Sequence, residues 1–294
     1  AIVTYALGIG ANIAIFSVAW PVLVSPLPFP DEQALVHLWL TAENARGERG
    51  GNPISPGDYH DIRTATAFSG TAAYATRLSQ MNMMNMSNLT SGAEPRQVAV
   101  AHVTPSFFDV MGIGPIAGRT LHASDETGDG LLVVLGEHTW RTMFGGDPGI
   151  IGRIVRLDGA PMEVVGVVPS TTGLGTLDAD AWTSLVLPAS RERTRAYYLR
   201  AVARLAPGVS RETANEELAA IMARAAADFP TSNRLVSARA DDFRESLTGP
   251  VRDSLFALIA GAALLLVVAA INLAGLLVAR TLHRGKELGI RRAL

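Results

Sequence analysis

The longest uninterrupted run of apolar residues lies near the end of the chain. Residues 254–279 contain no charged side chain and consist mainly of Ala, Leu, Val, Ile and Gly. A helix of this length reaches roughly 39 Å at about 1.5 Å per residue, which is enough to cross a hydrocarbon core of roughly 30 Å with some tilt. The pattern therefore predicts a transmembrane helix over residues 254–279.

Another apolar run begins the chain. No charged side chain precedes Asp31, and Trp20 stands where an aromatic ring can lie at a membrane interface. A cleaved signal peptide is the alternative interpretation. However, the run has no basic start, and Pro26, Pro28 and Pro30 follow where small residues would mark a cleavage site. We therefore predict a transmembrane helix over residues 1–24 as well.

Basic side chains follow the predicted helix over residues 254–279 at once. Residues 280–294 carry five basic side chains against one acidic, whereas residues 1–279 have a net charge of −6. Positive charge directly after a span marks the cytoplasmic side of the membrane. Residues 280–294 are thus predicted to begin a cytoplasmic loop, and residues 25–253 to lie outside the cytoplasm. An acidic outer domain argues against a nucleic acid partner, because phosphate binding needs a basic face.

The region between the predicted spans mixes strand and helix patterns. Apolar, β-prone runs predict strands over residues 34–40, 71–78, 80–89, 97–103, 131–135, 154–157, 162–168 and 197–205. Helices are predicted over residues 59–68, 106–110, 137–144 and 210–229, the last with Ser210 as its N-cap. There is no regular alternation of strand and helix. The fold class expected for residues 25–253 is therefore α+β, in two subdomains and flanked by the two transmembrane helices.

The clearest hairpin signal is Asp158-Gly159, which stands between two β-prone runs. An Asp-Gly pair is typical of a two-residue turn. Because Ala160-Pro161 follows before the next run begins, we expect a longer loop at this position.

Candidate chemical groups are few. Asp58, His60 and Asp61 could bind a metal or exchange protons, but they follow a Pro-Gly turn, where an Asp commonly caps a helix. Thioethers can bind Cu(I), although a strand with Met at its apolar positions also explains Met81, Met83, Met84 and Met86. The sequence has no cysteine and no nucleophile or nucleotide-binding motif. We therefore expect neither catalysis nor a bound cofactor or metal.

Small and polar residues interrupt the two predicted spans. An Asn in hydrocarbon usually faces a partner helix, and Gly lets two helices approach closely. We therefore predict helix packing at Gly8, Asn12, Gly261, Asn272 and Gly275. Such positions are typical of a bundle of several membrane helices. Because the chain begins without Met and ends within an expected helix, we expect it to be a fragment of a longer polypeptide.

Several segments of the sequence resemble one known family. GIGANIAIFS at residues 8–17, followed by PLPFP at residues 26–30, is similar to the first span and its exit in MacB/FtsX-type ABC transporter permeases. VTPSFFDVMG at residues 103–112, FGGDPGIIGR at 144–153 and LAPGVS at 205–210 resemble their MacB-like periplasmic core domain. KELGIRRAL at residues 286–294 resembles the start of the first cytoplasmic loop in the FtsX-like membrane unit. The resemblance covers essentially the whole chain.

The resemblance implies a permease subunit that is not itself an enzyme. Such permeases lie in the bacterial inner membrane, dimerise, pair with a cytoplasmic ABC ATPase and pass its ATP-driven motion to the outer domain. A homodimer or heterodimer is therefore expected, and the resemblance leaves room for a periplasmic adaptor or another protein partner. The expected ATPase contacts are Arg284, Lys286, Glu287, Arg291 and Arg292, although topology and lipid headgroups explain these charges equally well.

Other functions stay open from the sequence. Within the same family, the chain could serve lipoprotein release or the regulation of a cell-wall hydrolase. A membrane-anchored extracytoplasmic enzyme or solute-binding sensor is the alternative from a different class. That alternative predicts a polar pocket with convergent ionisable groups.

Overall fold

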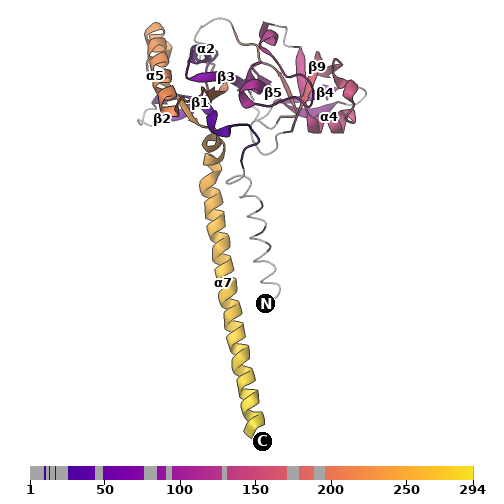
Figure 1. Ribbon diagram of the computed structural model, residues 1–294, viewed down its shortest axis with the longest axis vertical. Helices are drawn as coiled ribbons and strands as arrows, with labels where there is room; N and C mark the ends of the chain where they lie inside the picture. The colour runs from indigo at the N-terminus through magenta and orange to yellow at the C-terminus, as the bar shows by residue number, and fades with distance from the viewer. Residues whose placement is uncertain are drawn as a thin grey trace. The chain divides into compact units, whose positions relative to one another are not determined.

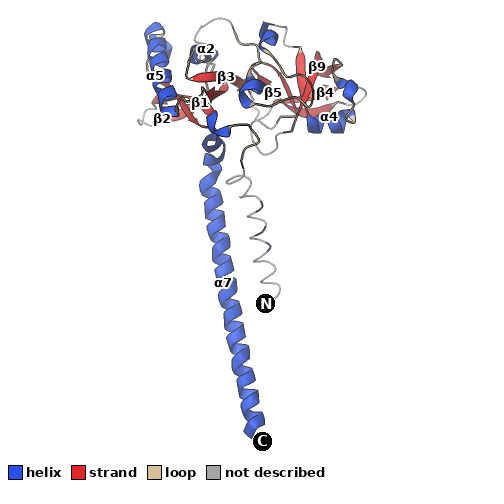
Figure 2. Ribbon diagram, viewed as in Figure 1, coloured by secondary structure: helices blue, strands red, loops and turns tan. Residues whose placement is uncertain are grey.

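The computed structural model describes residues 10, 13, 17, 26–43, 49–75, 85–90, 95–127, 131–170, 179–188 and 196–293. The chain divides into two compact units, each treated separately below. One comprises Leu27–Leu247 and contains all the strands of the described residues, and the other comprises Ala1–Pro26 together with Thr248–Leu294. Figure 1 shows the course of the chain, and Figure 2 shows its helices and strands.

The described part of Leu27–Leu247 is built on one continuous hydrogen-bonded sheet. Its strands are β1 (Leu35–Glu43), β2 (Arg49–Asn52), β3 (Phe68–Ala75), β4 (Asn85–Thr90), β5 (Arg96–Val103), β6 (Ala117–Gly118), β7 (Leu132–Gly136), β8 (Ile154–Leu157), β9 (Ala160–Val168), β10 (Ala181–Ser184), β11 (Arg200–Leu205) and β12 (Val236–Asp242). The helices are α2 (Pro56–Ile62), α3 (Phe107–Met111), α4 (Glu137–Phe144), α5 (Arg211–Asp228), α6 (Pro230–Asn233) and α7 (Phe243–Ala293), with short 3₁₀ turns η1 (Glu32–Ala34), η2 (Ala123–Thr127) and η3 (Pro148–Ile150). This mixture of strands and helices confirms the expected α+β class.

Six of the strands close into a barrel. The pairing runs from β5 through β10, β7, β9, β8 and β4 back to β5. Side chains alternate between the two faces of each strand, so that Val98 and Val100 of β5 point into the barrel while Ala101 and Val103 point away from it. The barrel interior is filled by buried apolar side chains, including Val133, Val164 and Leu157.

The sheet continues beyond the barrel as an open part with strand order β3-β11-β1-β12. In Figure 1, α2 and α5 lie beside this open part, whereas α4 lies beside the barrel strands. Leu38 and Leu40 of β1 pack with Leu218 and Met222 of α5 in one core. The open part and the barrel belong to one continuous sheet within one compact unit, and the expected division into two subdomains stays a prediction.

A third buried cluster joins the open sheet to the outer face of the barrel. Its centre is α3, whose Phe107 and Phe108 are almost fully buried. Just before α3, the Thr104 hydroxyl accepts a hydrogen bond from the Ala73 N–H (2.9 Å), and the Ser106 hydroxyl donates to the Thr71 carbonyl (2.8 Å). These bonds hold the VTPSFF segment across β3 and direct both Phe rings into the cluster.

The loop expected after Leu157 is shorter than the sequence indicated. Leu157 pairs directly with Ala160, so that Asp158 and Gly159 alone form the turn. Both residues have positive φ angles, 50° and 87°, as a tight hairpin turn requires. Ala160-Pro161 therefore begins β9, and the expectation of a longer loop was wrong.

Helix α5 confirms the helix predicted over residues 210–229. The Ser210 hydroxyl accepts a hydrogen bond from the Thr213 N–H (3.2 Å), which satisfies one free donor at the start of the helix. Leu218, Ile221 and Ala225 are buried on one face of this helix.

Helix α7 contains the long apolar run, and its residues from Thr248 onward belong to the second compact unit. Among the described residues, no single helix is long and apolar enough to cross a membrane, whereas the bent pair Phe243–Gly249 and Ser254–Val268 meets this criterion when taken together. The break between the two parts contains Pro250, which removes a helical hydrogen bond and bends a helix. The span expected over residues 1–24 lies outside the described residues, apart from residues 10, 13 and 17.

Candidate functional site

The two ends of the folded domain meet at one point of the open sheet. Strands β1 and β12 are antiparallel neighbours, and Val36 near the start of β1 pairs with Asp242 at the end of β12. The incoming segment, residues 27–34, and the first turn of α7 therefore lie at the same end of these strands. We call this region the junction and define it by Leu27, Phe29, Glu32, Arg204, Phe243 and Arg244.

An ion pair ties the two chain ends together at the junction. Arg244 Nη2 donates hydrogen bonds to both carboxylate oxygens of Glu32, at 3.0 and 3.1 Å. The same carboxylate accepts a hydrogen bond from the Leu27 N–H at 2.6 Å. Both charged side chains are about three-quarters buried, so solvent screens this pair less than a surface pair. Glu32 thus holds the incoming segment and α7 at once.

Aromatic packing reinforces the ion pair. The rings of Phe29 and Phe243 meet edge to face with their centroids 6.0 Å apart, and both side chains are buried. Between Phe29 and Glu32, Asp31 adopts a left-handed conformation with φ 48°. Apart from Gly, Asp is among the residues that adopt this region most readily, and contacts around the turn hold it in place.

Arg204 of β11 supplies such contacts. Its Nη1 donates to the carbonyls of Pro30 (3.1 Å) and Asp31 (3.2 Å), and its Nε donates to the Val110 carbonyl (3.0 Å) at the end of α3. Arg204 therefore joins the incoming segment to α3 through backbone carbonyls. Gly112, the C-cap of α3, lies against Pro30 of the incoming segment. A Cβ at this position would collide with the Pro30 ring, and its φ of 72° also favours Gly.

His37 of β1 is a buried polar group beside the junction. Its ring centroid lies 3.9 Å from that of Trp39 and 6.4 Å from that of Phe243. Burial, together with the nearby Arg200 guanidinium, lowers the pKa of His37 from 6.5 to about 3. Among the described residues no group pairs with its buried Nε2. His37 is therefore a neutral imidazole in a largely apolar environment.

Asp58, His60 and Asp61, the candidate chemical cluster of the sequence, lie on α2. Asp58 does not cap this helix. The N-cap is Ser55, whose hydroxyl accepts from the Asp58 N–H and donates to Asp58 Oδ2 (2.6 Å). Asp58 Oδ1 also accepts from Asn233 Nδ2 at 2.6 Å, so the buried carboxylate connects α2 to α6. The expectation that Asp58 caps the helix was wrong, because Ser55 is the N-cap and the Asp58 side chain is buried in the first turn.

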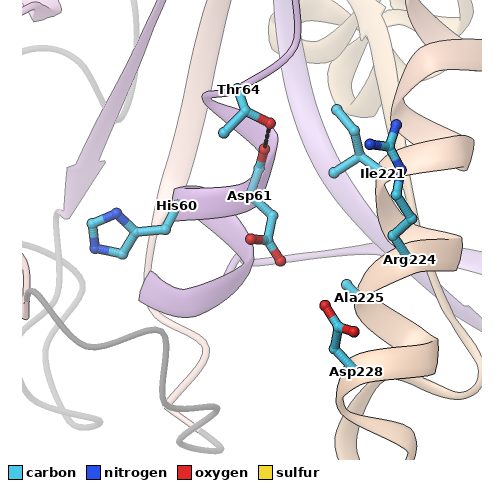
Figure 3. A pocket seen from close by; sticks show the side chains of 7 residues that line it. All are labelled: His60, Asp61, Thr64, Ile221, Arg224, Ala225 and Asp228. Carbon is cyan, nitrogen blue, oxygen red and sulfur yellow. Dashed lines mark hydrogen bonds between the residues drawn. The ribbon is translucent and has the colours of Figure 1, made fainter.

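His60 and Asp61 line a cavity of about 430 Å³ between α2 and α5. Figure 3 shows His60 pointing away from α5, and its Nε2 hydrogen-bonds the Pro188 carbonyl at 2.8 Å. The carboxylates of Asp61 and Asp228 face the space between the helices, with Arg224 above them. Across the described ranges of the chain, no three His, Cys, Asp or Glu side chains are grouped so that they could hold a metal ion. Of the four methionines considered for copper, only Met86 lies within the described residues.

The sequence-predicted site residues lie away from the junction residues in the chain. Gly8 and Asn12 are outside the described residues, whereas Gly261, Asn272 and Gly275 lie on α7. No described atom lies within 4 Å of a Cβ built on Gly261 or Gly275, so helix packing there stays a prediction. The backbone of α7 also carries the expected ATPase contacts Arg284, Lys286, Glu287, Arg291 and Arg292. Their role stays a prediction as well.

Sequence reasoning missed the junction itself. Glu32 and Arg244 are 212 residues apart, and neither stands in a motif that indicates a partner. The one available signal was the short, Pro-rich connection at residues 26–30, which indicates a stiff segment between the predicted span and the folded domain.

Comparison with known proteins identifies the fold. The sequence profile of the family described as "MacB-like periplasmic core domain" matches residues 1–221. The chain belongs to this family. A solved domain of a putative permease from Porphyromonas gingivalis has a TM-score of 0.55 at 17% identity, covering 74% of this chain and 92% of that one. The periplasmic region of MacB from Actinobacillus actinomycetemcomitans has a TM-score of 0.53 at 12% identity, covering 75% of this chain and 94% of that one. At these identities the two structures establish a shared fold.

Relatives with assigned names are macrolide export ATP-binding/permease proteins. MacB 1/2 of Paracoccus denitrificans is 26% identical over 259 residues, which are 82% of this chain and 37% of that protein. MacB of Chromobacterium violaceum is 26% identical over 199 residues, covering 67% of this chain and 30% of that protein. The MacB-like chain thus spans about a third of the length of these relatives. The resemblance to MacB-type permeases found in the sequence is confirmed.

Proposed function

We propose that this chain is part of a permease subunit of a MacB/FtsX-type ABC transporter in the bacterial inner membrane. In this role, its periplasmic domain moves in response to ATP hydrolysis by a partner ATPase. The observation that carries the proposal is the junction, where one carboxylate binds both the incoming segment and the first turn of α7. A domain held in this way receives displacement of either chain end at one point, the junction.

The membrane placement rests on the apolar surface of α7. Leu264 and Ile271 are 65% and 64% exposed, and large apolar neighbours between them are exposed as well. A contiguous exposed apolar surface of this kind marks contact with lipid or with partner helices. The spans proposed for residues 1–24 and 254–279 would bury this surface, and the basic residues after position 279 favour a cytoplasmic end.

The continuous backbone of α7 supports the coupling. The helix runs from Phe243 to Ala293 and so connects the junction to the proposed ATPase contacts within one element. A displacement applied near Arg291 and Arg292 would pass along this helix and, through the bend at residues 250–253, reach Phe243 and Arg244. The MacB-type relatives are named as ATP-binding/permease proteins, which supports an ATPase, fused or separate, as the source of that displacement.

The test uses the full-length parent protein in nanodiscs together with its ABC ATPase. We expect stable association, and ATP turnover that depends on the permease. Changing Arg291 and Arg292 together to Glu should abolish both. The control is Arg141→Ala on α4, which removes an exposed ion pair with Glu137 far along the chain from α7 and should change neither. Failure to associate with any ATPase, or unchanged turnover in the double variant, would overturn the proposed coupling.

A further inference from the structure

A series of buried rings connects the junction to the barrel. Successive ring centroids are 5.6 to 6.4 Å apart along the whole series. We call this series the ring column, and its members in order are Phe29, Phe243, His37, Tyr74, Phe107, Phe108 and Trp182. They come from the incoming segment, α7, β1, β3, α3 and β10, so the column crosses every layer between the junction and the barrel.

Each member of the column is buried, and most neighbouring rings meet edge to face. Buried side chains pack at the density of an organic crystal, so a shift of one ring must be taken up by its neighbours. Edge-to-face pairs also have a preferred geometry, which resists sliding of one ring past another. The column is therefore a direct mechanical connection between α7 and β10.

His37 occupies the position where the column leaves the junction. Its ring lies 6.4 Å from Phe243 on α7 and 6.4 Å from Tyr74 on β3. It is also the one member with a ring nitrogen that is buried and, among the described residues, unpaired. Leaving such a group without a partner disfavours the packed arrangement. A small displacement of the Phe243 ring that admitted water to Nε2 would relieve this cost.

We propose that His37 is a positioning residue that makes the junction a two-state element, packed or hydrated, and passes displacement of α7 through the ring column to α3 and β10. This inference rests on the proposed function, in which α7 moves. It goes further than the proposed function in one respect, because it names the residues through which displacement of α7 enters the domain. A series of touching side chains alone does not establish a coupling path. An element with two distinct states is also required, and His37 would supply it.

The experiment is a double-mutant cycle read by hydrogen exchange of chain 1–294 in detergent micelles. Arg244→Ala releases α7 from Glu32 and should speed amide exchange in α3 and β10 by about fivefold. With His37→Ala present, the same Arg244 change should leave exchange in α3 and β10 unaltered. Equal acceleration in both backgrounds would overturn the inference. No ATPase takes part, so this result is independent of the test of the proposed function.

Two further variants keep the cycle interpretable. Leu40→Ala removes an equally buried side chain from the same strand, but on the opposite face, outside the column. In the Leu40→Ala background, Arg244→Ala should still speed amide exchange in β10. His37→Phe retains a ring without the unpaired nitrogen, so it should favour the packed state, slow the overall exchange and reduce the response of α3 and β10 to Arg244→Ala. If His37→Ala does not fold, His37→Leu replaces it, because Leu fills the site without providing a ring.

Discussion

Arg244 in the first turn of α7 donates two hydrogen bonds to Glu32, which lies before the first strand of the domain. Because Glu32 also accepts from the Leu27 N–H, this one contact fixes both connections between the MacB-like domain and the rest of the chain. A loose connection would let α7 move without the domain. The junction instead ties the segment that enters the sheet at β1 to the helix that leaves it after β12.

Loss of the ion pair should destabilise the domain modestly. Arg244→Ala and Glu32→Gln are each expected to lower the free energy of unfolding by about 1 kcal/mol, because the pair is only partly buried. The two changes together should cost less than their sum, since they remove the same interaction. Thermal unfolding of chain 1–294 measures all three variants. Strict additivity would show that the two side chains do not interact.

Gly112 should tolerate no larger residue. Gly112→Ala places a Cβ against the Pro30 ring in a left-handed backbone conformation, and we expect a loss of about 2 kcal/mol. Gly114→Ala is the matched control, because no described atom lies within 4 Å of its added Cβ. Urea unfolding compares the two variants. Equal stabilities would mean that the contact between the incoming segment and α3 adjusts freely.

Acid should destabilise the domain through His37. Its pKa is about 3 in the folded chain and near 6.5 when unfolded, so the unfolded chain binds one more proton between these values. Stability is therefore lost as the pH falls from 6.5 toward 3, by up to about 1.4 kcal/mol per pH unit. His37→Phe should remove this contribution from the measured slope, whereas His138→Phe at an exposed position should retain it. An unchanged slope in His37→Phe would contradict the buried neutral imidazole.

Asn215 should protect the outer edge of β12. Its side-chain oxygen accepts from the Ala240 N–H (2.7 Å) and its amide nitrogen donates to the Ala240 carbonyl (3.3 Å), as a neighbouring strand would. An uncovered edge strand invites pairing with another chain. We expect Asn215→Ala to increase self-association, measured by light scattering. Asn215→Asp retains only the hydrogen-bond acceptor, so its self-association should lie between those of the unchanged protein and Asn215→Ala. A monodisperse Asn215→Ala protein would show that the edge is protected by other means.

The sequence could predict those parts of the fold that depend on local pattern. Ser210 and the apolar spacing behind it define α5, and the β-prone runs around Asp158-Gly159 define a hairpin. The turn was placed correctly but its length was not, because Ala160 and Pro161 are weak strand formers that pairing with β8 holds in β9. Strand context here outweighs intrinsic propensity.

Long-range pairing accounts for what the sequence did not predict. Barrel closure depends on β10, a strand of four residues that pairs with β5 about eighty residues earlier in the chain. The Glu32–Arg244 contact depends in turn on β1 and β12 being neighbours, which no local pattern encodes. The family resemblance supplied the fold. Of the junction residues, however, only Leu27 and Phe29 lie in a segment that carried it, and Glu32 and Arg244 do not.

Spin-label distances in the full-length parent protein with its ATPase test the central claim most directly. Residues 1–294 have no cysteine, so within them Leu235→Cys near β12 and Ile154→Cys on β8, which are 64% and 59% exposed, give defined label positions. Any cysteine elsewhere in the parent protein or the ATPase is first replaced by Ser. We predict that ATP with vanadate shifts the distance distribution between these labels, and that adding Glu32→Gln and Arg244→Ala abolishes the shift. A shift that persists in the double variant, or no shift in the parent, would contradict transmission through the junction.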